Sequence, residues 1–303
     1  MAEDLIEIYK WSEENNLSFN CDKFALIRYR TTGSQVDPDY EYLTPTGSII
    51  ENVKQTKDLG ILMSSDLTFK DHLEIMITKC KQLMGWVLRT FKTRDKLPML
   101  TLWKTLLLSR LDYCSQLWSP TQIGEMQKIE GLQRTFTSYI KDGKDLNYWE
   151  RLEHLKLYSV ERRHERYQII YAWKIIEDHI VSPDDFELSN INSRTGRKFL
   201  IFNPQGASRS ALNKLHNTPL YRTMKSFNSL PKKIRNITGL STENFKYQLD
   251  RFISNVPDQP NIPGYKKPAL SNSICDQMKY MECQIGGELV VAKSSKSGQE
   301  ASK

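Results

Sequence analysis

The spacing of hydrophobic positions changes near residue 67. Residues 3–16 predict one helix, and the stretch after it holds short β-prone runs separated by turn residues, at 23–30, 40–43, 48–50 and 58–63. From Thr68 onward, apolar residues recur every three or four positions, as expected for amphipathic helices, and the longest such stripe runs from Leu73 to Phe91. The pattern predicts a mainly α protein with a small α+β segment at its start.

Helical spacing continues through most of the chain. It predicts helices at 99–111, 123–140 and 159–179, with a short helical turn at 147–157. After a loop from Pro183 to Asn192, a strand is expected at 198–203, followed by helices at 220–230 and 243–256. The Pro-, Lys-, Ser- and Gly-rich sequence beyond residue 256 predicts disorder. The predicted parts are an α+β segment over 1–66, a helical bundle over 67–182, a basic α/β element over 183–256 and a disordered tail over 257–303.

Composition narrows the class of protein. Of the 303 residues, 39% are hydrophobic, which suffices for a packed core. No apolar run is long enough for a membrane span, and the first residues lack the pattern of a secretory signal, so a cytoplasmic or nuclear location is expected. The cysteines show no CxxC pair and no ligand spacing, which predicts reduced thiols without zinc; they are Cys21, Cys80, Cys114, Cys275 and Cys283.

Positive charge is concentrated in one segment. The net charge is +7, whereas residues 192–235 alone carry ten cations and no acid, so the remainder sums to about −3 (+7 minus +10). Such a segment favours a polyanionic partner; the alternative is a basic surface that contacts another part of a larger protein. Its cations are Arg194, Arg197, Lys198, Arg209, Lys214, Arg222, Lys225, Lys232, Lys233 and Arg235.

Five local strings occur in a fixed order. They are Trp11-x3-Asn15-Asn16-Leu17-Ser18-Phe19-Asn20-x2-Lys23; Lys57-Asp58-Leu59-Gly60-Ile61-Leu62 with Leu67-Thr68-Phe69-x2-His72; Leu111-Asp112-Tyr113-Cys114 through Trp118-Ser119-Pro120; Ile129-Glu130-x2-Gln133-Arg134 with Asn147-Tyr148-x2-Arg151; and Phe227-Asn228-Ser229-Leu230-Pro231. In this order and spacing they resemble the carboxy-terminal part of the reverse transcriptases of non-LTR retrotransposons, the LINE-type elements of the jockey and chicken-repeat-like group. The resemblance covers about residues 3–256.

The resemblance implies the end of a palm, a Leu-Gly primer-grip hairpin and a helical thumb-like bundle. In the family these parts hold RNA or DNA as primer–template, and nucleotidyl transfer needs Mg²⁺ held by a Tyr/Phe-Ala-Asp-Asp turn and an earlier aspartate. This sequence holds no such string, which in the family precedes the segment that resembles 11–23. We therefore expect no catalysis by this chain alone, no metal or cofactor site, no catalytic residue and no small-molecule substrate.

Each candidate residue has a second interpretation. Lys23 matches a palm-end lysine that can act as a general acid in the family, but it also fits a phosphate contact or a solvated side chain. Leu59 and Gly60 fit a close approach to a primer strand, or a hairpin that needs glycine for its own turn. The cations of the first long helix fit a phosphate-tracking face or a solvated one; they are Lys70, Lys79, Lys81, Arg89 and Lys92.

The tryptophans at positions 86, 103, 118, 149 and 173 could stack on bases, but most of them lie on apolar helical faces, so core packing is expected. Three functions follow as hypotheses. The first is a truncated, catalytically incomplete reverse transcriptase-like protein that keeps nucleic-acid binding. The others are a host-recruited helical module that binds nucleic acid or protein, and a working polymerase. The expected nucleic-acid-binding residues are Lys23, Leu59, Gly60, Lys79, Lys81, Arg89, Lys92, Arg194, Arg197, Lys198, Arg209, Lys214, Arg222 and Lys225.

Overall fold

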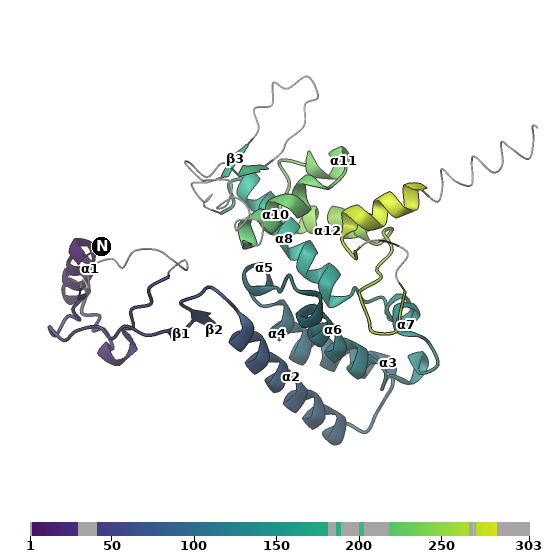
Figure 1. Cartoon of the computed structure of the whole chain (residues 1–303), viewed down its shortest axis with the longest axis horizontal. Helices are drawn as coiled ribbons and strands as arrows, with labels where there is room; N and C mark the ends of the chain where they lie inside the picture. The colour runs from purple at the N-terminus through teal and green to yellow at the C-terminus, as the bar shows by residue number, and fades with distance from the viewer. Residues whose placement is uncertain are drawn as a thin grey trace, which may run out of the picture. The chain divides into compact units, whose positions relative to one another are not determined.

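The structure of the protein is a computed structural model (Figure 1) that describes residues 2–29, 41–180, 186–188, 200–202, 218–266, 269 and 271–283. The described part is mainly helical, with two small antiparallel sheets of two strands each. The chain divides into two compact units, Met1–Thr78 and Lys79–Lys303, and the division falls inside helix α2 (Lys70–Thr90). Among the described helices, none combines the length and the apolar character needed to cross a lipid bilayer.

The first unit contains helix α1 (Ala2–Glu14), the 3₁₀ turn η1 (Cys21–Lys23) and strands β1 (Gln55–Asp58) and β2 (Ile61–Ser64). Three aromatic rings, those of Tyr9, Phe19 and Phe24, meet edge to face at centroid distances of 5.7–6.0 Å. The strand expected at 23–30 is wrong for its described part: the run begins in η1 and makes a single parallel bridge, between Leu26 and Asn52. A β-prone run forms a strand only where a neighbour accepts its backbone hydrogen bonds in register.

A tight hairpin joins β1 to β2. Asp58 pairs with Ile61, which leaves Leu59 and Gly60 as a two-residue loop with φ values of 43° and 93°. Two successive positive φ angles are the signature of a type I′ turn, whose twist matches that of the flanking strands. The single strand expected at 58–63 is therefore wrong, because the chain reverses inside it.

The first half of the second unit is a helical bundle. After α2 come α3 (Lys96–Leu102), the π-helical segment η2 (Trp103–Leu108), α4 (Ser109–Asp112), α5 (Ser115–Trp118), α6 (Ile123–Thr137), the 3₁₀ turn η3 (Lys141–Gly143), α7 (Tyr148–Leu155) and α8 (Val160–Ile176). These bounds confirm the helices expected at 99–111, 123–140 and 159–179 to within a few residues at most ends. Trp103 and Phe136 are fully buried, with ring centroids 5.1 Å apart.

The second half packs against α8. It contains β3 (Phe186–Leu188), β4 (Leu200–Phe202), α10 (Pro219–Asn228), α11 (Lys232–Arg235), α12 (Thr242–Ile253) and a helix over 274–283. α10 and α12 lie beside α8 (Figure 1), and buried side chains of these helices form one core. Trp173 of α8 stacks on Phe245 of α12 at 4.3 Å and 5°. The domain boundary expected near residue 182 does not separate two units, because helices on both sides of it share one core.

Residues beyond 256 differ from the expected disordered tail. Asp258 accepts hydrogen bonds from the backbone N–H and the Oγ–H of Ser159, at 2.6 and 2.7 Å. The buried Arg162 donates through Nη2 to the carbonyls of Pro257 and Asn272, at 2.8 and 2.9 Å. The expectation of disorder is wrong for 257–266 and 271–283, because these long-range contacts leave no mark on local composition; residues 284–303 lie outside the described part.

Candidate nucleic-acid interface

One side of α2 carries an exposed stripe with an aromatic residue between two cations. Lys79, Gln82, Trp86 and Arg89 are spaced three, four and three residues apart, so they line up along the helix, and all four are exposed. Trp86 is 48% exposed, whereas Cys80 and Val87 on the other side are fully buried. We call these four residues the α2 stripe.

The expectation that Trp86 belongs to the core is wrong. Trp86 precedes the buried Val87 by one position, which rotates it about 100° away from the apolar side of the helix. The same expectation is confirmed for Trp103, Trp118 and Trp173, which are buried. Trp149 is half-buried and donates through Nε1 to the Pro260 carbonyl at 3.2 Å. Helical periodicity alone could have identified the exposure of Trp86.

Neighbouring side chains shape this stripe. The ring of Phe91 meets that of Trp86 edge to face at 6.1 Å. Nη1 of Arg89 would lie 3.5 Å from a Cβ built on Gly85, so the guanidinium folds back along α2 beside that glycine. Arg94, which the sequence analysis did not single out, donates to the carbonyl of Leu88 at 2.8 Å and to that of Phe91. It therefore satisfies carbonyl groups at the end of α2, where a cation is also favoured by the helix dipole.

The other cations expected on this helix are not all on one side. Lys79 and Lys81 are two residues apart, which places them about 200° apart around the axis. Lys81 is exposed but lies outside the α2 stripe, and Lys92 is exposed just beyond the end of the helix. No carboxylate in the described part of the chain forms an ion pair with Lys79, Lys81, Arg89 or Lys92. Their charges are thus available to an external anion.

The candidates of the first unit lie at two turns. Lys23 is the exposed last residue of η1, in which the Asn20 side chain accepts a hydrogen bond from the Asp22 N–H. Leu59 is 83% exposed at the tip of the β1–β2 hairpin. Gly60 adopts a conformation that the hairpin itself requires. The geometry therefore accounts for this glycine without a ligand.

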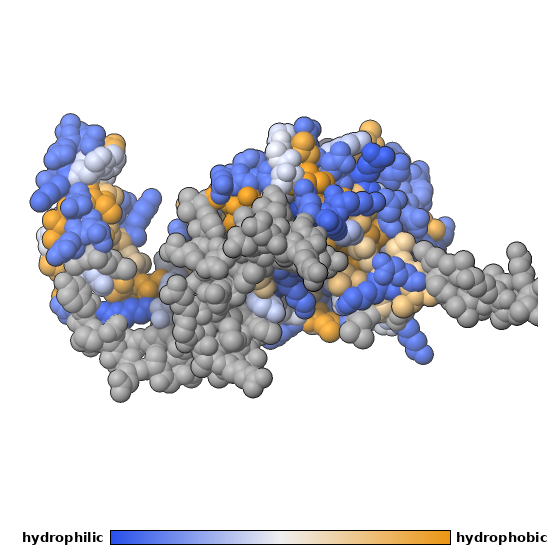
Figure 2. All heavy atoms as spheres, turned by 90° about the horizontal axis from the view of Figure 1, so that it is seen from above, coloured by the Kyte–Doolittle hydropathy of each residue, from blue (hydrophilic) through white to orange (hydrophobic). Residues whose placement is uncertain are grey.

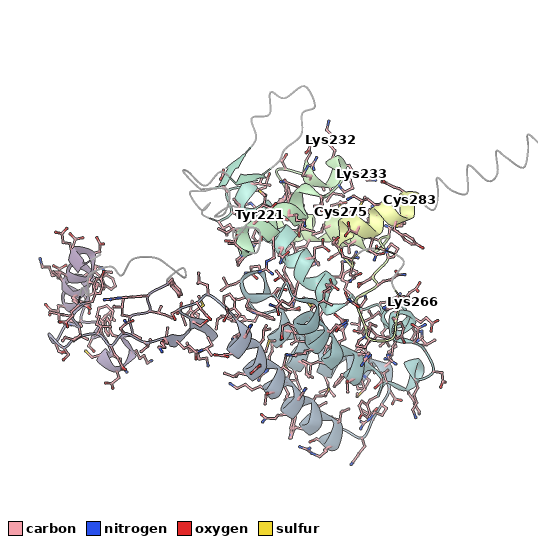
Figure 3. All side chains as sticks on the ribbon, in the orientation of Figure 1. Tyr221, Lys232, Lys233, Lys266, Cys275 and Cys283 are labelled. Carbon is pink, nitrogen blue, oxygen red and sulfur yellow. The ribbon has the colours of Figure 1, made fainter. Side chains whose placement is uncertain are left out.

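The basic segment divides into cations of different kinds. Arg194, Arg197, Lys198, Arg209 and Lys214 lie outside the described residues. Lys225, Lys232 and Lys233 are exposed, and Figure 3 shows the last two on α11. Arg235 is buried and donates to the Asn228 carbonyl at 2.6 Å. Arg222 is largely buried and donates through Nη1 to the Ser119 carbonyl, and burial lowers its pKa to about 10. A segment read as one basic surface thus includes two arginines built into the fold.

A buried polar network joins η2, α6, α7 and α8 of the bundle. Trp103 donates through Nε1 to Gln133 Oε1 at 3.2 Å, and Gln133 donates through Nε2 to Tyr148 Oη at 3.1 Å. Tyr148 in turn donates to Glu130, whose other oxygen accepts from the N–H of Glu161 at 3.2 Å. Burial raises the pKa of Glu130 to about 8, so this carboxyl is protonated in a large fraction of molecules at neutral pH. Sequence reasoning found Glu130, Gln133 and Tyr148 only as parts of strings, and the network gives them a structural role.

Acidic and metal-binding side chains do not converge within the described residues. No group of three or more His, Cys, Asp or Glu side chains there is arranged to hold a metal ion. No family model matches this chain, and comparison with curated proteins and with solved structures gave no significant match.

Proposed function

We propose that this chain is the carboxy-terminal part of a non-LTR retrotransposon reverse transcriptase, catalytically incomplete by itself, and that it binds nucleic acid through the α2 stripe. The order of the five sequence strings supports the family. The observation that carries the binding role is the exposure of Trp86 between Lys79 and Arg89 on one side of α2.

Charge and base stacking act together in the proposed binding. Lys79 and Arg89 are ten residues apart along α2, which corresponds to about 15 Å. Phosphates of one duplex strand follow each other every ~3.4 Å along the axis, so the stripe spans about four of them. Cations on phosphates fix position without reading sequence, and an exposed aromatic ring can stack on any base. The expected binding is therefore salt-dependent and largely independent of sequence.

The proposal also separates binding from catalysis. The sequence holds no Tyr/Phe-Ala-Asp-Asp string, and two-metal nucleotidyl transfer needs carboxylates that converge on one point. Primer extension by the purified chain with deoxynucleotides and Mg²⁺ tests this part directly. We expect no incorporation; incorporation that is abolished by changing one acidic residue of the chain would refute it.

The binding role is tested with two variants and two matched controls. Trp86→Ala removes the stacking ring, and Tyr247→Ala removes another exposed ring, 65% accessible, from the outer side of α12. Lys79→Gln/Arg89→Gln removes two charges of the α2 stripe, and Lys104→Gln/Arg110→Gln removes two exposed charges elsewhere. Fluorescence anisotropy with a primer–template and with single-stranded RNA, from low to high KCl, gives affinity and its salt dependence.

We expect Trp86→Ala to weaken single-strand binding by roughly 5- to 150-fold, which corresponds to ~1–3 kcal/mol per stacked base. The double charge variant should reduce the slope of log K against log salt by about 1.4 to 1.8, at ~0.7–0.9 per phosphate. The control variants should bind like wild type. Equal binding by all five proteins, or equal losses in controls and stripe variants, contradicts the proposed interface.

A further inference from the structure

A pocket of about 930 Å³ lies in the second unit, away from the α2 stripe. Its walls are α10, one side of α8 and residues 271–279, with residues 119–126 at its edge, and no residue of α2 lines it. Figure 3 labels two of its lining residues, Tyr221 and Cys275. The volume lies in the range of small-molecule and cofactor sites, which is ~300–1,000 Å³.

The α10 wall carries two cations without an acidic partner. Arg222 and Lys225 are three residues apart, hence neighbours on one side of the helix, and both line the pocket. Within the described residues, no carboxylate forms an ion pair with either side chain. Burial is the cause of the lowered pKa of Arg222, as expected where no acid compensates the buried charge. The Nε–H of Arg222 is buried and has no hydrogen-bond acceptor among the described residues.

The acids of the other walls are already engaged. Glu165 accepts the N–H of Ile274 at 3.0 Å and lies 3.9 Å from Nε of Arg162. Asp276 accepts from Ser271 Oγ at 2.7 Å and lies 3.9 Å from Nζ of Lys279. Glu161 is the third acid of the lining. With Lys279 counted, the lining has three cations and three acids, but the two cations of the α10 wall form no ion pair with these acids.

Arg222 is held in place by a chain of hydrogen bonds at the edge of the pocket. A carbonyl oxygen only accepts, so His164 Nε2–H donates to Leu111 at 2.9 Å, and His164 Nδ1 accepts from Ser119 Oγ–H at 2.8 Å. Burial lowers the pKa of His164 to about 4, which keeps the ring neutral at pH 7. Ser119, fixed in this way, offers its carbonyl to Nη1 of Arg222. The guanidinium is thus positioned before any ligand arrives.

We propose that this pocket binds a phosphate monoester of nucleotide size, with Arg222 and Lys225 on the phosphate. A phosphate monoester carries close to two negative charges at pH 7 and several acceptor oxygens, which suits two cations better than a single carboxylate would. The remainder of the ligand faces the hydroxyl and amide groups of Gln168, Asn228, Ser229 and Ser273. The phosphate can belong to a free nucleotide or to the 5′ end of a strand. The inference does not depend on the α2 stripe, since the two sites share no residue.

The wild-type chain itself offers a reporter for occupancy. Cys275 lines the pocket and is half-buried, whereas Cys283 is exposed and does not line it; both are labelled in Figure 3. The rate of alkylation of each thiol by iodoacetamide is measured by mass spectrometry in the presence of AMP, adenosine, and a short oligonucleotide with a 5′-phosphate or a 5′-hydroxyl.

A phosphate-bearing probe should slow the modification of Cys275 by the factor 1 + [L]/Kd, about tenfold at ten times Kd, and leave Cys283 unchanged. Protection by AMP alone identifies a free nucleotide as the source, and protection by the 5′-phosphorylated strand alone identifies a strand end; either result supports the proposal. It is overturned if neither probe protects Cys275, or if adenosine and the 5′-hydroxyl strand protect equally well.

Substitutions then assign the phosphate contact. Isothermal titration with the protecting probe should show a loss of roughly 10- to 150-fold for Arg222→Gln, the range for a lost hydrogen bond to a charged group. Lys225→Gln, at an exposed position, should show a smaller loss and tests the pocket even where Arg222→Gln does not fold. The control is Lys232→Gln/Lys233→Gln, on the neighbouring α11, and should bind like wild type. Unchanged affinity in both pocket variants would overturn the assignment.

Discussion

The first unit leaves many of its large apolar side chains in solvent, whereas the second unit encloses a large apolar core, although it also exposes rings such as Trp86 and Tyr247. In the first unit, Met1–Thr78, exposed apolar residues gather in and after α1; they are Ile6, Ile8, Trp11, Leu17 and Phe19. Orange spheres, which mark hydrophobic residues, are visible among the blue ones at the left of Figure 2, where this unit lies. In the second unit, Trp103, Trp173 and Phe245 have no accessible surface. Apolar burial contributes ~25 cal/mol per Å², so the two units differ in how much stability their own contacts supply.

The units also differ in their polar interiors. In the second unit, buried polar side chains form hydrogen bonds between different elements, such as Glu130 to Tyr148, 18 residues apart, and Arg162 to the Asn272 carbonyl, 110 residues apart. In the first unit, side-chain hydrogen bonds of α1 and η1 are often short-range, such as that from the Asp22 N–H to Asn20, although Tyr9 donates to the Leu43 carbonyl at 2.9 Å. The buried networks of the second unit hold its elements in a defined arrangement, because an unpaired polar group in the interior costs free energy.

The largest expected difference between the units concerns aromatic packing. Phe245→Ala removes a fully buried ring stacked on Trp173 and should lower the free energy of unfolding by about 3–5 kcal/mol. Phe19→Ala removes a ring that is 40% exposed, so the loss should be only about 1–2 kcal/mol. Urea unfolding followed by far-UV circular dichroism measures both. Equal losses of unfolding free energy in the two variants would contradict the difference between the two units.

The next effect is the pH dependence of the second unit. Burial raises the pKa of Glu130 to about 8 and that of Glu165 to about 7, above the ordinary value of 4.5. A raised pKa means that the folded state holds a proton that the unfolded state has released, so stability present below pH 4.5 is lost as the pH rises through the folded value. His164 acts in the opposite sense: its lowered pKa of about 4 makes stability fall as the pH drops from 6.5 to 4.

Between pH 7 and 8 Glu130 is the largest contributor to the slope, because Glu165, with a folded pKa of about 7, has lost half of its proton at the start of this window and the folded His164 is neutral throughout it. We expect wild-type stability to fall in this window with a slope of at most about 1.4 kcal/mol per pH unit. Glu130→Gln should flatten the slope, and Glu153→Gln, an exposed change on α7, should leave it as it is. Urea midpoints at several pH values give the slope. A fall that persists unchanged in Glu130→Gln would show that another group causes it.

The smallest expected effect compares two asparagine caps. Asn147 caps α7 through a capping box: its side chain accepts from the Glu150 N–H at 3.1 Å, and Glu150 accepts from the Asn147 N–H at 2.9 Å. Asn147→Ala should cost about 1 kcal/mol. Asn20 caps only the three-residue turn η1 in the first unit, so Asn20→Ala should stay within about 0.5 kcal/mol. Thermal unfolding of the two variants provides the comparison, and a larger loss for Asn20→Ala would reverse it.

The sequence by itself determined the helices of the second unit. A helix of several turns repeats its core-facing side every three to four residues, so α6, α8, α10 and α12 were visible as patterns of Leu, Ile, Phe and Trp. Local chemistry also fixes the hairpin, since the positive φ at Gly60 is a property of two neighbouring residues and their turn. The cations of the α2 stripe were likewise identified from the sequence, and Trp86 could have been placed with them by its angle on the helix.

Only the tertiary structure decided which polar groups are buried and which distant segments meet. Glu130 is a surface-type residue in any local reading, yet it is enclosed because α6, α7 and α8 converge on it. Residues 257–266 and 271–283 have a loop-like composition, yet Arg162 and Ser159 bind them across about a hundred positions of sequence. The pocket around Arg222 also forms from segments that no periodicity connects. Burial is a property of the space between elements, so a pattern read along a single element does not contain it.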